Sequence, residues 1–194
     1  MFISDTGIYY FIMWFLAYGM CGWLLESVYM SICNKKITNR GFMKSPMCPI
    51  YSVGALIVYY FLKPISQNLI LVFLVGSVVA TIVEFITAHL MIRIFGDFWW
   101  DYDDKPFNYK GILCLESSIA WGIYSVCLFV FLHKGITFLI DLIPRTKGVI
   151  AAIVLLTVFS VDFTVTMYQK KKDDIPSSLL EIRDRIKERI NKVL

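Results

Sequence analysis

Charged residues are scarce in this 194-residue sequence. Asp, Glu, Lys and Arg make up 18% of it, whereas soluble domains average roughly 25%. The hydrophobic share is 58% and the mean hydropathy is +0.66. This composition excludes an ordinary soluble domain and predicts an all-α polytopic membrane protein. The net charge of +4 does not indicate a nucleic-acid partner, because the location of Lys and Arg matters more than their sum in such a protein.

Several sequence motifs are also missing. Without a GxxxxGK[ST] segment the chain has no P-loop for ATP, and neither GxSxG nor HExxH is present to mark a nucleophile or a zinc protease. The N-terminal segment MFISDTG lacks the Lys and Arg that open a signal peptide, so we interpret the first apolar run as a retained span. No cofactor and no metal are expected, since Glu84, His89 and a Cys show no convincing ligand spacing.

The apolar runs predict a transmembrane domain over residues 1–170 with about five helices. The expected spans are 7–32, 48–62, 68–94, 112–133 and 148–168. The second is short and opens at Pro49. Residues 135–143 are apolar but too few to cross, and we interpret them as an interfacial or re-entrant segment.

The basic residues predict the orientation of these spans. With the N-terminus outside and the C-terminus inside, all 19 Lys and Arg residues except Lys63, Lys134, Arg145 and Lys147 fall on the cytoplasmic side. This bias agrees with the positive-inside rule.

Residues 171–194 predict a cytoplasmic amphipathic helix. Ser178 and Glu181 have the spacing of a capping box, and apolar residues then recur every three or four positions opposite a basic face. Such a helix suits the anionic inner leaflet of the bilayer, a protein partner or a second copy of the chain.

Four acidic residues fall in or at the edges of the spans, where a charge at the helix centre costs about 2.5 to 3.5 kcal/mol. In the expected orientation all four lie in the cytoplasmic half of the bilayer, above two irregular polar loops. We therefore predict a cytoplasm-facing pocket, with Arg40 able to reach a buried Glu or an anionic ligand. The residues expected to form it are Glu26, Asn39, Arg40, Glu84, Trp99, Trp100, Asp101, Asp103, Asn108, Lys110, Glu116 and Asp162.

A structural interpretation of the same residues stays open. The acids can pair with Arg40, Arg93 or Lys110 to fix helix packing, and the two Trp residues can form an interfacial belt. A second hypothesis is an internal duplication, because Glu26, an Asn-Arg-Gly loop and Cys48 are matched in order by Glu84, an Asn-Tyr-Lys-Gly loop and Cys114.

Four segments together resemble a known bacterial family. They are GWLLES at 22–27, NRGF…SPMCPIYSVGAL at 39–56, WWDY…PFNYKGILCLE at 99–116 and WGIYS at 121–125. These segments are similar to the ABC-transporter permeases of type IV, the CmpB-like integral membrane proteins. The resemblance covers residues 7–133 and implies a transport role in a bacterial cell membrane. It also implies a separate ATPase subunit, and five spans are few for a complete permease, so a homodimer or a second membrane subunit is expected.

Three functions are compatible with the sequence. The first is a permease subunit whose buried acids bind a cation or protons while the aromatic loop gates access. The second is a membrane-embedded enzyme acting on a lipid or lipid-linked substrate, with Asp101, Asp103 and a buried Glu as acid and base. The third is a non-catalytic accessory protein that acts through its C-terminal helix.

Overall fold

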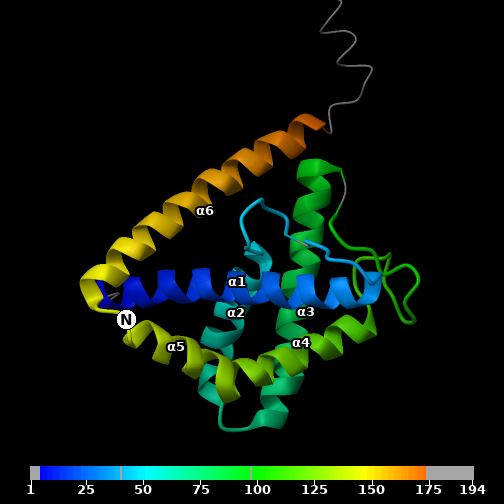
Figure 1. The fold of residues 1–194 in the computed structure, drawn as a ribbon. Coiled ribbons are helices and arrows are strands. Elements are labelled where there is room, and N and C mark those ends of the chain that lie inside the picture. Colours follow the sequence, from blue (N-terminus) through cyan, green and yellow to red (C-terminus); the bar gives the residue numbers. More distant parts are fainter. Residues whose placement is uncertain (1–4, 40, 97, 174–194) are drawn as a thin grey trace, which may run out of the picture.

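The computed structural model describes residues 5–39, 41–96 and 98–173, and these residues contain helices but no strand (Figure 1). The all-α prediction is confirmed. The elements are α1 (Asp5–Asn34), α2 (Pro49–Leu62), η1 (Lys63–Ile65), α3 (Leu69–Phe95), α4 (Leu115–Cys127), η2 (Leu128–Leu132), α5 (His133–Asp141) and α6 (Arg145–Asp173). Arg40 and most of the predicted C-terminal helix, residues 174–194, lie outside the described residues.

Four helical stretches are long and apolar enough to cross a membrane. They are Gly7–Asn34, Leu69–Phe95, Leu115–Asp141 and Arg145–Lys171. The stretch Pro49–Ile65 is apolar but shorter, as its sequence indicated. Length and composition therefore support a multi-pass membrane protein.

Local sequence signals explain where these helices begin and end. Pro49 opens α2 at a position where a missing N–H costs nothing. The Asn68 side chain caps α3 by accepting the N–H of Leu71 at 3.1 Å. Gly96 ends α3 with φ of +77°, a left-handed conformation that glycine adopts without steric cost.

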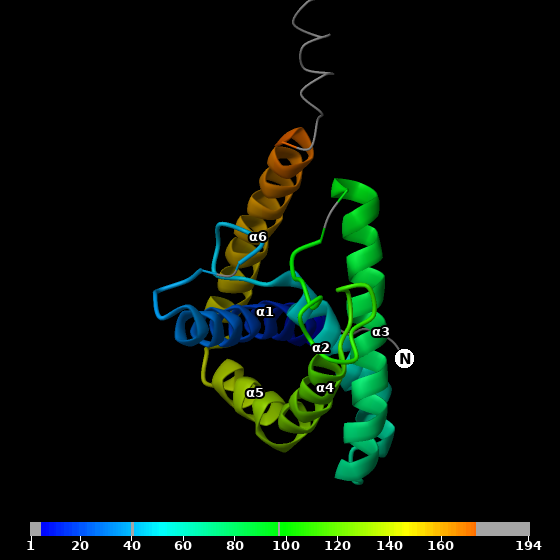
Figure 2. The ribbon, with the colours of Figure 1, turned by 90° about the vertical axis from the view of Figure 1, so that its right-hand side faces the viewer.

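The fourth helical stretch differs from the prediction. Residues 135–143 do not form a separate short segment, because α4 continues through the π-helical η2 directly into α5. The ribbon bends at this π segment (Figure 2), as helices do where an extra residue enters the hydrogen-bond ladder. The sequence does not reveal such a bulge, since the apolar run 126–132 contains no Pro or Gly to mark it.

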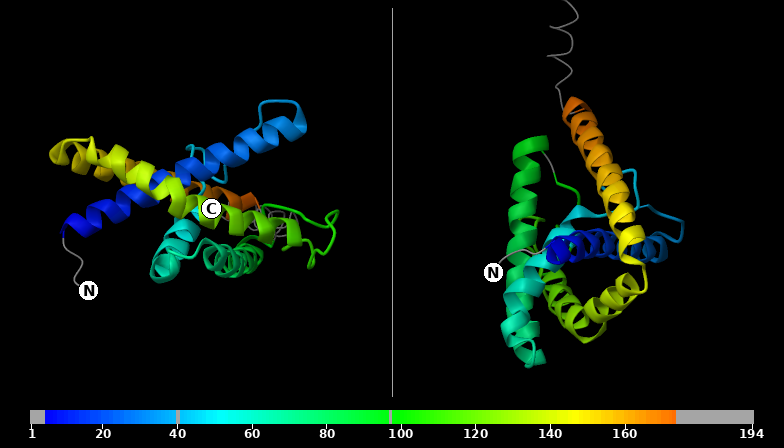
Figure 3. Two further views of the ribbon diagram at one scale, coloured as in Figure 1. Left: turned by 90° about the horizontal axis from the view of Figure 1, so that it is seen from below. Right: turned by 90° about the vertical axis from the view of Figure 1, so that its left-hand side faces the viewer.

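The main helix–helix contacts pair α1 with α2 and α3 with α4, and α2 also packs on α3. Seen from below, the α4–η2–α5 stretch crosses α1 (Figure 3). Glycines allow close approach in both helix pairs: Gly22 of α1 faces the Tyr51 ring of α2, and Gly76 of α3 faces Ser125 of α4. Small residues serve this purpose in membrane helix packing, where apolar lipid removes the hydrophobic driving force.

The two long loops, of which the first joins α1 to α2 and the second joins α3 to α4, meet the end of α6 at one end of the molecule. The Phe42 ring from the first loop lies 5.5 Å from the Trp99 ring of the second and 6.2 Å from Phe163 of α6. The Lys170 ammonium lies 3.5 Å from the centroid of the Trp99 ring, a cation–π contact. These contacts place both loops beside the C-terminal part of α6.

Substitution of Gly22 tests the close approach of α1 and α2. A Cβ at Gly22 overlaps the Tyr51 ring, so Gly22→Ala is expected to cost about 1–3 kcal/mol of stability. Gly135→Ala in α5 is the matched control, because no atom lies within 4 Å of its added Cβ. Thermal unfolding in detergent should show a lower Tm for Gly22→Ala and an unchanged or higher Tm for Gly135→Ala, since alanine favours helix. Equal Tm values for the two variants would contradict this packing.

Candidate functional site around Glu84

Glu84 lies inside the helical bundle, in the middle of α3, and only 3% of it is exposed. Three side chains direct hydrogens at its carboxylate. The Tyr102 hydroxyl donates to Oε1 at 3.0 Å, the Trp121 indole N–H donates to Oε2 at 3.0 Å, and the Ser117 hydroxyl lies 3.3 Å from Oε2. We call these four residues the Glu84 cluster.

The Glu84 carboxylate is stabilised by uncharged hydrogen-bond donors, and it has no cationic partner among the described residues. A carboxylate offers about four lone-pair sites. Tyr102 and Trp121 occupy one each, and Ser117 shares its single proton with the Cys114 carbonyl at 2.9 Å. The carboxylate therefore keeps about one lone-pair site without a hydrogen-bond donor. Because the carboxylate is negative, this site suits a proton or a cation.

The second loop brings Tyr102 to this position by folding back on itself. The N–H of Tyr102 donates to the carbonyl of Gly111 at 2.9 Å, and the Trp100 indole donates to the carbonyl of Ile112 at 2.8 Å. Lys110 and Gly111 both have positive φ, +52° and +67°. This internal closure holds Tyr102 against α3, so the loop and Glu84 are joined directly.

Tyr102 is a hydrogen-bond donor over the whole neutral pH range. Burial, followed by the negative charge of Glu84, raises the pKa of its hydroxyl far above the ordinary value. The phenol thus stays protonated and donates to the carboxylate, which makes it a neutral clamp on the charged form of Glu84.

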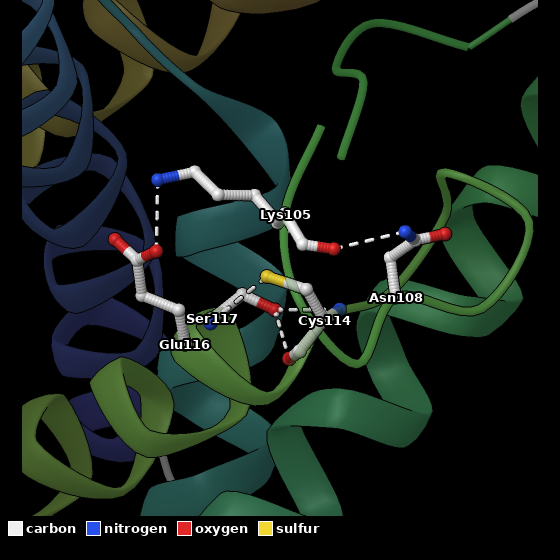
Figure 4. A network of polar contacts seen from close by, with 5 residues as sticks. All are labelled: Lys105, Asn108, Cys114, Glu116 and Ser117. Carbon is white, nitrogen blue, oxygen red and sulfur yellow. Dashed lines mark hydrogen bonds and ion pairs between the residues drawn. The ribbon is translucent and has the colours of Figure 1, made fainter. Parts of the chain in front are cut away.

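The start of α4 organises the other side of the Glu84 cluster. Cys114 is its N-cap: the sulfur accepts the N–H of Ser117 at 3.3 Å, and the Ser117 hydroxyl accepts the N–H of Cys114 at 3.4 Å. Figure 4 shows this reciprocal pair between the loop and the helix. The cap orients the Ser117 hydroxyl toward Glu84.

Glu116, beside Ser117, is placed differently. Its carboxylate is exposed and pairs with the Lys105 ammonium at 2.8 Å (Figure 4). This hydrogen bond and the charge of Glu116 raise the pKa of Lys105. The Asn108 amide fastens the same loop by donating to the Lys105 carbonyl at 2.9 Å.

Glu26 lies next to the Glu84 cluster. The Tyr51 hydroxyl of α2 donates to its carboxylate at 2.9 Å, and the Tyr51 ring lies 5.4 Å from the Trp121 ring. Tyr51 and Trp121 therefore form an aromatic link between the half-buried Glu26 of α1 and the buried Glu84 of α3.

The first loop is fastened by the remaining polar residues. The Asn39 side-chain oxygen accepts the Trp23 indole N–H at 2.8 Å and the Gly41 N–H at 3.0 Å. Asp162 of α6 accepts the N–H of Ser45 at 2.6 Å. Asp162 thus joins the first loop to α6 and takes no part in the Glu84 cluster.

The polar residues of the second loop mostly contact one another. Asp101 accepts the N–H of Asp103 at 2.9 Å, and both carboxylates lie against Gly111. Asn108 donates to the carbonyl of Asp103 at 3.0 Å, and the Lys110 ammonium lies 5.5 Å from the Tyr109 ring centroid. These contacts shape the loop.

Comparison with known families agrees with the four segments noted in the sequence. The family model described as "Putative ABC-transporter type IV" (ABC_trans_CmpB) matches residues 13–167, well over half of the chain. The chain belongs to this family. It is a multi-pass membrane protein of the type IV ABC-transporter family, and the matched range contains the whole Glu84 cluster. No curated protein and no solved structure matches in these comparisons.

Of the twelve residues expected in the pocket, the structure brings Glu84 and Glu26 together and places Glu116 and Asp162 elsewhere. Four side chains that contact these two acids were missing from the expected set: Tyr51, Tyr102, Ser117 and Trp121. All except Ser117 occur in the family-like segments of the sequence. A buried carboxylate requires hydrogen-bond donors. Tyr, Ser and Trp can supply them, but they carry no charge that would mark this role in the sequence.

No metal ligands converge in the described part of the type IV protein, where no three His, Cys, Asp or Glu side chains come together. The His89 ring lies near Glu84 in sequence, but its Nδ1 contacts the carbonyl of Phe85 at 2.9 Å. His89 is exposed, whereas Glu84 is buried.

Removal of the Tyr102 hydroxyl tests the Glu84 cluster. Hydrogen bonds to charged groups are worth about 1.5–3 kcal/mol, so Tyr102→Phe should destabilise the protein by that amount. Tyr109→Phe is the control, because this tyrosine is in the same loop but is 52% exposed. Thermal unfolding should separate the two variants, and a Tyr102→Phe protein as stable as Tyr109→Phe would show that the contact contributes nothing.

Proposed function

We propose that this protein is the membrane subunit of an ABC-type transport system and that Glu84 is its cation-binding group. A buried carboxylate inside a membrane domain, hydrogen-bonded but without a cationic partner among the described residues, carries the proposal. Ionisable residues at this depth are costly and generally mark ion or substrate pathways. Binding of a proton, a metal cation or the cationic group of a larger substrate would neutralise the charge that burial penalises.

The second loop acts as the gate in this proposal. Tyr102 lies between Glu84 and the loop backbone, so a cation that takes its place at the carboxylate must displace the hydroxyl or share the oxygen with it. Displacement would release the loop from α3. When the hydroxyl is displaced, occupation of the site and opening of the loop are thus coupled through one hydrogen bond.

Energy for transport would come from a separate ATPase, since the sequence contains no P-loop. The positive-inside distribution supports an orientation in which both long loops and the end of α6 face the cytoplasm of a bacterial cell. The cluster of Phe42, Trp99 and Lys170 supports a common side for these three segments. An ATPase or a second copy of the chain would then approach from that side.

The enzyme hypothesis receives less support from the same geometry. Asp101 and Asp103, its expected acid and base, contact the loop backbone and Gly111. The accessory hypothesis rests on a helix outside the described residues. Glu84, by contrast, combines burial with remaining hydrogen-bond capacity.

Substitution of Glu84 by Gln tests cation binding. A ligand that binds only the folded protein raises its stability by about 2.7 kcal/mol at one hundred times its Kd. We expect Na⁺ or K⁺, each exchanged for choline at constant ionic strength, or a lower pH to raise the Tm of the wild type. The Tm of Glu84→Gln should not respond in this way. Glu116→Gln is the matched control, because it removes an exposed carboxylate in the first turn of α4 and should keep the response.

Two results would overturn the assignment of Glu84. The first is a wild-type Tm that is insensitive to every cation and to pH between 5 and 8. The second is an undiminished response in Glu84→Gln. In either case the cluster serves only to fasten the loop to the helices.

A further inference from the structure

A cavity of about 370 Å³ opens at the opposite end of the molecule from the two long loops, where α2 turns into α3. It extends from the 63–67 turn to the π-helical segment η2. Its volume is within the range of small-molecule sites. It shares no residue with the Glu84 cluster.

The mouth of the cavity is basic. Lys63 and Lys134 come from different helical stretches and line it together with the polar residues Ser66 and Gln67. None of the nine lining residues, all within the described chain, is acidic. Two ammonium groups without a lining carboxylate favour an anion at this position.

The wall of the cavity is apolar and aromatic. Leu69, Phe129 and Val130 supply this part of the lining, next to Tyr59. The Tyr59 ring stacks on the Phe129 ring at 5.8 Å and on the His133 ring at 3.9 Å. This surface lies within the apolar stretches that can cross a membrane, so it is suited to a hydrocarbon chain.

His133 adds a polar group between these two regions. Its Nδ1 lies 2.6 Å from the hydroxyl of Tyr18, which is 2% exposed. When Tyr18 donates to Nδ1, the neutral ring carries its own proton on Nε2 and is a donor there. His133 lines the cavity, and a donor on its ring suits the oxygens of an anionic head group.

We propose that this cavity binds an anionic amphiphile, with a phosphate-type head group at Lys63 and Lys134 and an acyl chain against Phe129 and Val130. The π segment positions Phe129, Val130 and His133 together, since all three belong to η2 or follow it directly. The site lies in the outer leaflet in the orientation that the Lys and Arg distribution predicts. It is independent of cation binding at Glu84.

The test uses the full chain in detergent with three probes: phosphatidylglycerol, phosphatidylcholine and glycerol 3-phosphate. Binding is measured as the rise in Tm and, directly, by native mass spectrometry. We expect phosphatidylglycerol to bind and stabilise, while phosphatidylcholine and glycerol 3-phosphate do not. Each lysine near anionic lipid contributes an attraction that corresponds to roughly a fivefold difference in affinity. Removal of one lysine should therefore weaken the binding of phosphatidylglycerol by about that factor.

The variants Lys63→Gln and Lys134→Gln, alone and combined, should lose the preference for phosphatidylglycerol. Lys147→Gln is the control, because it removes a lysine near the start of α6 that does not line the cavity. If the double variant fails to fold, the two single variants carry the comparison. Val130→Trp, which fills the apolar wall, should weaken lipid binding while both lysines remain.

Three results would overturn the proposal. Equal binding of phosphatidylcholine would show that the head-group charge is irrelevant. Equal binding of glycerol 3-phosphate would show that the acyl chain is irrelevant. An unchanged affinity in Lys63→Gln and Lys134→Gln would place the lipid elsewhere on the protein.

Discussion

The burial of one carboxylate in an apolar helical bundle is the constraint on which the rest of this structure depends. A charge at that depth costs about 2.5 to 3.5 kcal/mol unless hydrogen bonds compensate it. At Glu84 the compensation comes from α4 through Ser117 and Trp121 and from the second loop through Tyr102. Two separate stretches of chain, α4 and the second loop, must therefore reach the carboxylate that α3 carries, and the positions of all three are fixed relative to one another.

The same requirement explains why irregular loops adjoin apolar helices in this protein. Backbone groups near the bilayer need internal partners, and both long loops provide them in a similar way. The Asn39 oxygen accepts the N–H of Gly41, and the Asn108 oxygen accepts the N–H of Gly111. Cys48 and Cys114 then occupy the N-cap positions of the following helices. These matched features support the hypothesis of an internal duplication.

Much of the fold follows from sequence because lipid imposes simple rules. Apolar run length predicts the long helices, and Pro49, Asn68 and Gly96 mark helix ends through local chemistry. The π segment at Leu128–Leu132 and the partners of Glu84 have no such signal. The π segment depends on an extra residue within the apolar run 126–132, where no Pro or Gly marks it. The partners depend on contacts such as Tyr102 with Glu84, which only the packed structure brings together. The sequence shows that acidic residues in these spans carry a free-energy cost. It does not show that Glu84 is buried whereas Glu116 is exposed.

Hydrogen exchange in the second loop tests the central claim most directly, namely that Glu84 holds this loop against the helices. The measurement compares amide protection over residues 98–113 in the wild type, in Glu84→Gln and in Glu116→Gln. If Glu84 anchors the loop, Glu84→Gln should exchange faster in this segment, including at the Tyr102 amide that donates to Gly111. The first loop, fastened by Asn39 and Asp162, should keep its protection. Unchanged protection of residues 98–113 in Glu84→Gln would contradict the account.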